Sequence, residues 1–110
     1  MADTGTTAQV ADRLLSIEIE LRRLQLWEHE RPPAEAFQST EPFCIDTLEF
    51  TQWVQFVFLE RMKFIIESAQ PLPEVSGIAP MAEEHFRGRP ESGQGLIREL
   101  EAVDQLLSGN

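Results

Sequence analysis

Apolar residues recur at alternating spacings of four and three along the first part of the chain, which is the period of one α-helical face. A helix is predicted from Thr6, with Gln9 as its capping-box partner, to about Glu30. Pro32 and Pro33 prevent it from continuing. Its buried face is expected to consist of Val10, Leu14, Ile17, Leu21 and Leu24.

A second apolar segment predicts the central helix of the fold, from Thr47 to about Ser68. Asp46 is a favourable N-cap residue, and Glu49 stands at the capping-box position. Most of the circumference of this helix is apolar, so it needs neighbours on more than one side. At about 100° per residue, the expected core face comprises Phe50, Trp53, Val54, Val57, Phe58, Phe64 and Ile65.

Two features of the central helix point to binding. With Phe50 set at 0°, Arg61 falls at about 20°, close to the middle of the expected core face. There it either forms a structural salt bridge or holds an anion in a groove. The opposite face mixes amides with large apolar side chains, which suits a second packing neighbour or a docking surface. The candidate contacts with a protein partner are Phe43, Gln52, Gln55, Phe56, Met62 and Lys63.

The first predicted helix also carries apolar side chains outside its core face. Leu15, Ile19 and Leu26 lie nearly opposite its core stripe and are rimmed by Arg22 and Arg23. Such a strip is typical of a partner surface or a homodimer seam, although scattered exposed leucines are also normal. The sequence is therefore compatible with a monomer and with a homodimer.

The remaining segments complete a helical bundle. Residues 31–45 form an unusually long link that holds one short helical turn at Ala34–Phe37. A short helix is predicted at Ser76–Arg87 and a final helix at Gln94–Leu107. Strand-like alternation is absent from the sequence. Three long helices and one short one predict an all-α fold, a single small up-and-down helical bundle.

Length and charge narrow the classes of function. A chain of 110 residues corresponds to one domain, expected at residues 6–108 after a disordered tail at residues 1–5. Nineteen Asp and Glu against nine Lys and Arg give a formal net charge of −10, which disfavours direct nucleic-acid binding and favours docking to a basic protein. The lone Cys44 excludes an internal disulfide framework. With no leader or membrane-spanning segment apparent, a cytoplasmic location is expected.

The sequence contains no recognisable catalytic pattern. His29 and His85 belong to no two-histidine ligand spacing, and no serine has an assignable acid-base partner. The glycines at 88–95 lack the ending and the preceding strand of a phosphate-binding loop. We therefore expect no metal, no cofactor and no enzymatic activity.

The segment 41–62 carries a more specific pattern. The pattern consists of short groups in a fixed order. These are Pro42-Phe43, Asp46-Thr47-Leu48, Phe50, Gln52-Trp53, Gln55, Phe58 and Arg61-Met62. This order resembles the signature of the YqcC-like family of small bacterial proteins. The resemblance implies a compact helical bundle of uncharacterised function, often encoded beside a tRNA pseudouridine synthase.

What the resemblance implies about function is an acidic, non-enzymatic accessory protein whose protein partner is a tRNA-modifying enzyme. The net charge is compatible with docking to a basic surface of such an enzyme. The residues themselves leave an alternative, a small-molecule or anion-binding helical module with a pocket near Arg61.

Overall fold

The computed structural model describes residues 4–74, 77–90 and 92–108. All regular structure in these ranges is helical, which confirms the predicted all-α class. None of the helices described there is long and apolar enough to cross a membrane. The elements are α1 (Thr4–Arg23), the 3₁₀ turns η1 (Ala34–Phe37) and η2 (Pro42–Cys44), α2 (Phe50–Trp53), the π-helical turn η3 (Val54–Phe58), α3 (Leu59–Glu67), α4 (Ile78–Phe86) and α5 (Gln94–Leu107).

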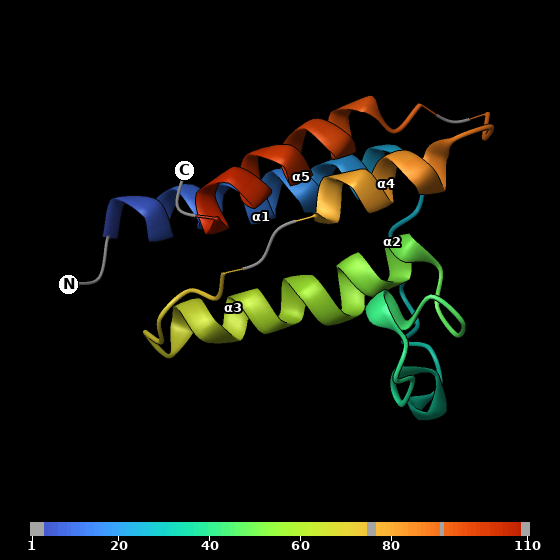
Figure 1. The fold of residues 1–110 in the computed structure, drawn as a ribbon, viewed down its shortest axis with the longest axis horizontal. Coiled ribbons are helices and arrows are strands. Elements are labelled where there is room, and N and C mark those ends of the chain that lie inside the picture. The colour runs from blue at the N-terminus through green and yellow to red at the C-terminus, as the bar shows by residue number, and fades with distance from the viewer. Residues whose placement is uncertain (1–3, 75–76, 91, 109–110) are drawn as a thin grey trace.

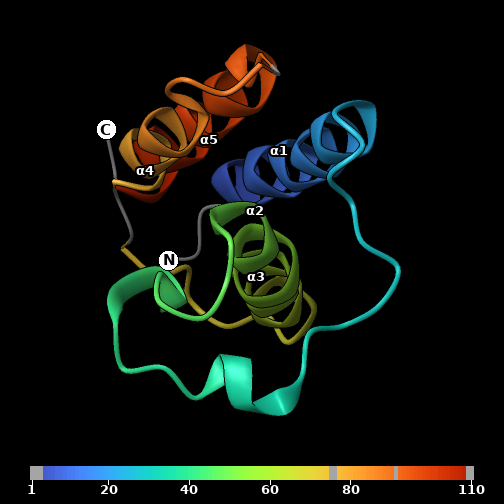
Figure 2. The same cartoon turned by 90° about the vertical axis from the view of Figure 1, so that its right-hand side faces the viewer.

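The helices form an up-and-down bundle. Elements α2, η3 and α3 follow one another without a break and make up the central helix, residues 50–67. Along the chain α1, the central helix, α4 and α5 run in alternating directions (Figure 1). Helix α5 packs against α1 and α4, while the central helix packs against α1 and, at its start, against α4 (Figure 2). The predicted stripes face this interior, since the buried residues include Val10, Leu14, Ile17 and Leu21 of α1 and Leu96, Leu100, Val103 and Leu107 of α5.

Helix α1 starts and ends earlier than predicted. It begins at Thr4, so the expected capping residues Thr6 and Gln9 lie inside it. Residues 1–3 of the expected tail lie outside the described residues.

The predicted extension of α1 to Glu30 is wrong because the chain turns back after Arg23. Gln25 adopts a left-handed conformation, with φ of 62°. The N–H of Leu26 then bonds to the carbonyl oxygen of Leu21 at 2.9 Å, which is the closing hydrogen bond of a Schellman C-cap. A helical period does not reveal such a cap when its left-handed residue is not glycine.

The central helix begins at Phe50, later than the predicted Thr47. Its N-cap is Glu49, which forms a capping box with Gln52; the N–H of Glu49 bonds to Oε1 of Gln52 at 2.8 Å. Asp46, the predicted cap, instead accepts a hydrogen bond from Oγ of Ser39. The capping chemistry was predicted correctly in type but assigned to the wrong position.

The π-helical turn η3 changes which side of the central helix faces the core. The N–H of Leu59 bonds to the carbonyl oxygen of Val54, five residues back, so the turn holds one extra residue. One residue rotates all that follows by about 100° relative to an uninterrupted α-helix. Met62, 1% exposed, thereby occupies the core position expected of Arg61. Arg61 and Phe64 are exposed, the latter by 62%, so their predicted place on the core face is wrong.

The last two helices agree well with the sequence. Helix α5 has the predicted bounds, and α4 lies within the predicted range, whose Ser76 is outside the described residues. The carboxylate of Asp104 on α5 caps α4, because its two oxygens accept the N–H groups of Ile78 at 3.1 Å and Ala79 at 2.9 Å. Because the partners are 25 and 26 residues apart, no local sequence pattern predicts this cap.

Candidate functional site

Two amides of the central helix fasten the connector, which we define as residues 24–49 between α1 and α2. Gln55 is 6% exposed. Its Oε1 accepts the N–H of Glu28 at 2.9 Å, and its Nε2 donates to the carbonyl oxygen of Glu28 at 2.8 Å. Nε2 of Gln52 also donates to Oε1 of Glu28 at 3.2 Å. These contacts fix where the connector leaves the bundle, because a buried amide without partners costs about 1–3 kcal/mol.

The far part of the connector is also anchored. Nη1 of Arg31 donates to both carboxylate oxygens of Glu60, at 3.0 and 2.8 Å, and its guanidinium lies 4.6 Å from the ring centroid of Phe37. Oγ1 of Thr47 donates to the carbonyl oxygen of Ala36 at 2.6 Å. The connector therefore forms a defined wall beside the central helix, visible as the teal segment that projects from the bundle in Figures 1 and 2.

Phe43 occupies a strained backbone position in this wall. The φ angles of Phe43 and Cys44 are 59° and 50°, in the left-handed region that bulky residues rarely adopt. The ring of Phe43 packs edge-on against Trp53, with centroids 4.7 Å apart, and lies 6.3 Å from the ring of Phe50. Strain of this kind costs on the order of 1–3 kcal/mol per residue and concentrates at functional sites. Here it sets the Phe43 ring against two separate hollows.

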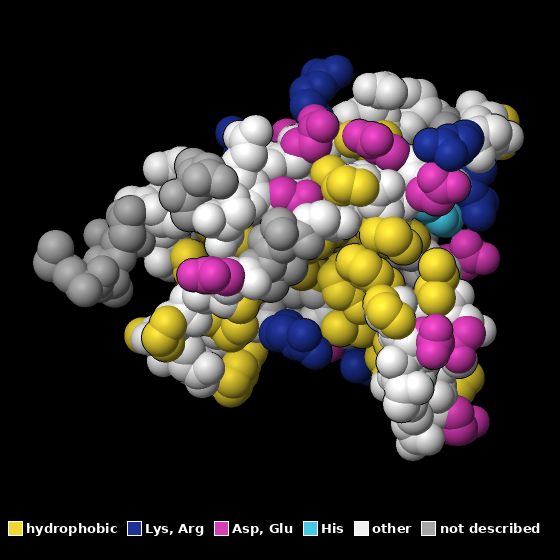
Figure 3. Space-filling view, viewed as in Figure 1, with side chains coloured by type: hydrophobic (Ala, Val, Ile, Leu, Met, Phe, Trp, Pro, Cys, Tyr) yellow, Lys and Arg dark blue, Asp and Glu magenta, His cyan; other side chains and the backbone are white. Residues whose placement is uncertain are grey.

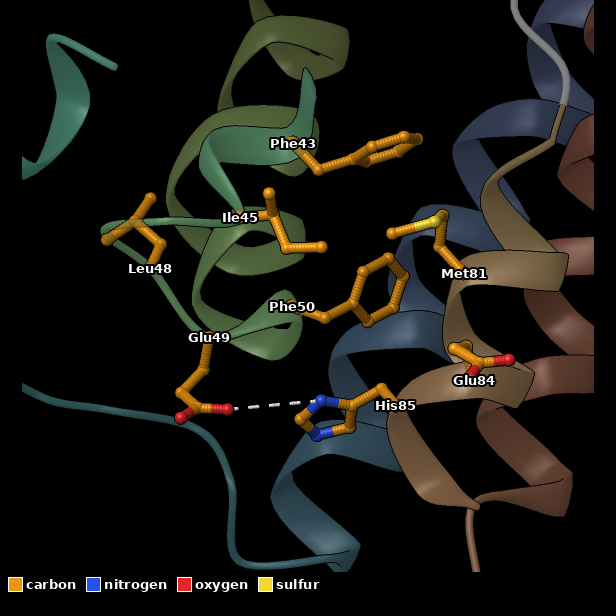
Figure 4. Close-up of a pocket in the computed structure, with 8 residues that line it drawn as sticks. All are labelled: Phe43, Ile45, Leu48, Glu49, Phe50, Met81, Glu84 and His85. Atoms are coloured by element: carbon orange, nitrogen blue, oxygen red, sulfur yellow. Dashed lines mark ion pairs between the residues drawn. The ribbon is translucent and has the colours of Figure 1, made fainter. Parts of the chain in front are cut away.

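The first hollow, which we call the apolar pocket, has a volume of about 190 Å³. It lies between the connector, the start of α2 and α4 (Figure 4). Phe43, Phe50 and Met81 point toward one another across it, and Ile45 lies at its edge (Figure 4). Ile45 is 61% exposed, so the apolar lining continues onto the open surface.

Charged and polar side chains form the other edge of the apolar pocket. Glu49, Glu84 and His85 line it. Nδ1 of His85 lies 3.9 Å from Oε2 of Glu49, and the same oxygen accepts a hydrogen bond from Nη2 of Arg89 at 3.5 Å. Across the described residues, no three His, Cys, Asp or Glu side chains are grouped to hold a metal ion.

The second hollow, which we call the open groove, has a volume of about 580 Å³ and lies between the connector and the outer side of the central helix. Arg61 lines it and forms no hydrogen bond or ion pair within the described residues. A structural salt bridge at Arg61 is therefore ruled out within that part of the chain. Five aromatic side chains also line the open groove: Phe37, Phe43, Trp53, Phe56 and Phe64.

Exposed carboxylates adjoin the apolar pocket on its connector side. Figure 3 shows hydrophobic side chains gathered where α4, the start of the central helix and the connector meet, with Asp and Glu side chains along the adjoining edge. Residues 34–49 include no Lys or Arg. Their four carboxylates are all exposed, at Glu35, Glu41, Asp46 and Glu49.

Four of the six predicted partner contacts do not present a free surface, because the connector covers part of the central helix and η3 rotates the rest. Gln52 is half-buried, and Gln55, Phe56 and Met62 are buried. Phe43 is half-buried at both hollows, and Lys63 is exposed, with Nζ 3.8 Å from Oε1 of Glu18. On α1, Leu15 and Ile19 are exposed as predicted, whereas Leu26 lies in the connector and is half-buried against the core.

Sequence reasoning missed Ile45, Met81 and His85 as lining residues of the apolar pocket. Ile45 stands in the same apolar run as Phe43, which is a signal that could have included it. Met81 and His85 come from α4, and only tertiary packing brings them to the connector. No rule of residue spacing predicts a tertiary contact of this kind.

Comparison with known proteins identifies the family. Residues 9–106 match the family model DUF446, described as tRNA pseudouridine synthase C. The chain is 33% identical over 103 residues to the protein YqcC of Escherichia coli K12, and the match covers 94% of each protein. The chain belongs to the YqcC family. This confirms the resemblance carried by residues 41–62.

Other matches extend the YqcC comparison. An uncharacterised protein of Haemophilus influenzae is 38% identical over 102 residues, which are 93% of this chain and 95% of that protein. The solution NMR structure of YqcC from E. coli matches with a TM-score of 0.80 at 33% identity, over 94% of this chain and 88% of the other. A protein of Pectobacterium carotovorum named tRNA pseudouridine synthase C is 38% identical over 81 residues, which are 74% of this chain but 22% of that protein.

Proposed function

We propose that this chain is a non-enzymatic accessory protein that docks onto a tRNA-modifying enzyme of the tRNA pseudouridine synthase C type. The observation that carries the proposal is the Pectobacterium relative, in which a segment similar to this chain makes up 22% of a longer protein bearing that name. Joining two modules in one chain raises the effective concentration of each for the other. A fused arrangement in one species is therefore a reason to look for association of the separate proteins in another.

The charge of the chain supports the same class of partner. A formal charge of −10 repels a polyphosphate. An enzyme that binds tRNA needs a basic surface for the phosphates, and an acidic protein is electrostatically complementary to such a surface. The accessory protein would then contact the enzyme rather than the RNA.

Size-exclusion chromatography with light scattering tests this proposal. The whole chain is mixed with the complete tRNA pseudouridine synthase C of the same organism at low and at moderate salt. We expect a stoichiometric complex that weakens as salt rises, because screening reduces complementary charge interactions. An unrelated basic enzyme of similar charge is the control. Absence of a complex at low salt, or an equal complex with the control enzyme, refutes the proposal.

A second candidate function is binding of a small organic anion in the open groove. The observation that favours it is Arg61, a cation without a carboxylate partner in the described residues, beside an aromatic lining. Titration with benzoate and with inorganic phosphate, followed by NMR, tests this function. Arg61→Gln should abolish the shifts at groove residues, whereas Arg98→Gln, at an exposed position on α5, should not. Equal behaviour of the two variants excludes the site.

A further inference from the structure

We infer that the apolar pocket receives one large apolar side chain from a basic segment of the partner protein. The identity of the partner rests on the proposed function, whereas the chemistry of the occupant rests on the pocket itself. Three observations support this occupant: the size of the pocket, the charge around it and the way its walls are held.

The size of the pocket fits a single side chain. A cavity of roughly 150 Å³ lined by apolar residues accommodates benzene, and the apolar pocket has about 190 Å³. One phenyl ring or branched aliphatic group therefore fills it. Docking would also cover Ile45, which is 61% exposed at its edge. A buried apolar anchor inside a polar rim is the usual arrangement of an interface hot spot.

The charge around the pocket selects the residues that flank the anchor. Glu49 and Glu84 line the pocket, and the connector beside it carries exposed carboxylates without any Lys or Arg between residues 34 and 49. Arg87 and Arg89 each pair with one of these two carboxylates, so the excess negative charge comes from the exposed connector residues Glu35, Glu41 and Asp46. Lysine or arginine next to the anchor would be complementary to this rim, and acidic flanks would be repelled.

The walls of the pocket are already formed in the free chain. Glu49 is at once the N-cap of α2 and the carboxylate facing His85 and Arg89. Phe43 is held by its turn and by the ring of Trp53. A site that is already ordered pays a smaller entropic penalty on binding, which favours affinity.

Short synthetic peptides test the inference by NMR on the whole labelled chain. The probe has a central Phe flanked on each side by two Lys residues, and its controls carry a central Ala or Glu flanks. We expect saturable shifts at Ile45, Met81 and His85 with the probe, with a dissociation constant on the order of 1 mM for so small a contact, and no such shifts with either control. Equal shifts with the Ala control would overturn the pocket assignment, as would no shift at all with the probe.

Matched variants locate the contact. Ile45→Ala should weaken probe binding at least about threefold, because an apolar contact is lost. Ile19→Ala should leave it unchanged, and Ile19 is equally exposed, at 61%, on the outer side of α1. Glu84→Lys should weaken binding more than Glu67→Lys, which makes the same change of charge at the far end of the central helix. Equal effects within either pair would overturn the assignment.

The same variants separate the two proposals. Probe binding without a complex with the synthase leaves the pocket assigned and refutes the partner. A synthase complex unaffected by Ile45→Ala and Glu84→Lys, with no probe binding, supports the partner and refutes the pocket. Concentration-dependent shifts at the pocket residues without any peptide would assign the pocket to a second copy of the chain and overturn the inference.

Discussion

Replacing Met62 by alanine should destabilise the protein far more than replacing Phe64 by alanine. An uninterrupted α-helix would give the opposite order, because it places Phe64 in the core and Met62 outside. Met62 is 1% exposed, and truncation of a buried Met costs about 2–5 kcal/mol, from lost burial and from the cavity left behind. Phe64 is 62% exposed, so its loss should change stability by no more than about 0.5 kcal/mol.

Urea unfolding and thermal melting, both followed by far-UV circular dichroism, measure this difference. A loss of about 3 kcal/mol in a domain of this size lowers Tm by more than about 10 °C. The Phe64→Ala protein should melt within a few degrees of the parent, at about 4 °C or less. If Phe64→Ala were the more damaging change, the central helix would lack the extra residue of η3, and Phe64 rather than Met62 would face the core.

Three further changes test other parts of the fold by the same measurements. Asp104→Ala should lower the free energy of unfolding by about 1–2 kcal/mol, because it leaves two N–H groups at the start of α4 without their acceptor. Glu101→Ala, at an exposed position on α5, is the control, and an equally small loss for both variants would contradict the cap. Gln25→Gly should stabilise the chain by about 0.5 kcal/mol, because glycine adopts a positive φ without strain, whereas Gln9→Gly within α1 should destabilise it by about 1 kcal/mol. Gln55→Ala should lower the free energy of unfolding by about 2–3 kcal/mol and speed hydrogen exchange at the backbone N–H of Glu28. Unchanged exchange would show that the Gln55 side chain does not hold the connector.

The parts of the fold that follow from local periodicity were predictable. The stripes of α1 and α5 and the single turn at Ala34–Phe37 appear where the sequence placed them. The errors arise where one residue departs from the regular geometry. The left-handed Gln25 ends α1 early, and the extra residue of η3 turns Arg61 outward. A helical wheel assumes about 100° for every residue, so it predicts neither a left-handed residue nor a π-helical turn.

The candidate site was less predictable than the fold, for a physical reason. A pocket is a property of tertiary packing, and the apolar pocket takes its lining from the connector, α2 and α4. The sequence identified Phe43 because it lies in a distinctive motif. For Phe56 and Met62 it left open a second packing neighbour or a docking surface, and their burial decides for packing. Periodicity identifies faces within one helix, and it cannot say which segment will come to cover a face.

The packing of α5 against α1, together with the cap that α5 lends to α4, bears on how the protein is made. On the ribosome α1 emerges first and α5 last. At about 5–20 residues per second, several seconds separate them. During that interval the apolar stripe of α1 is without its main cover, and the first turn of α4 is without its acceptor. The bundle therefore cannot close before α5 has been made, and nascent chains that still lack α5 should be the form most in need of chaperones.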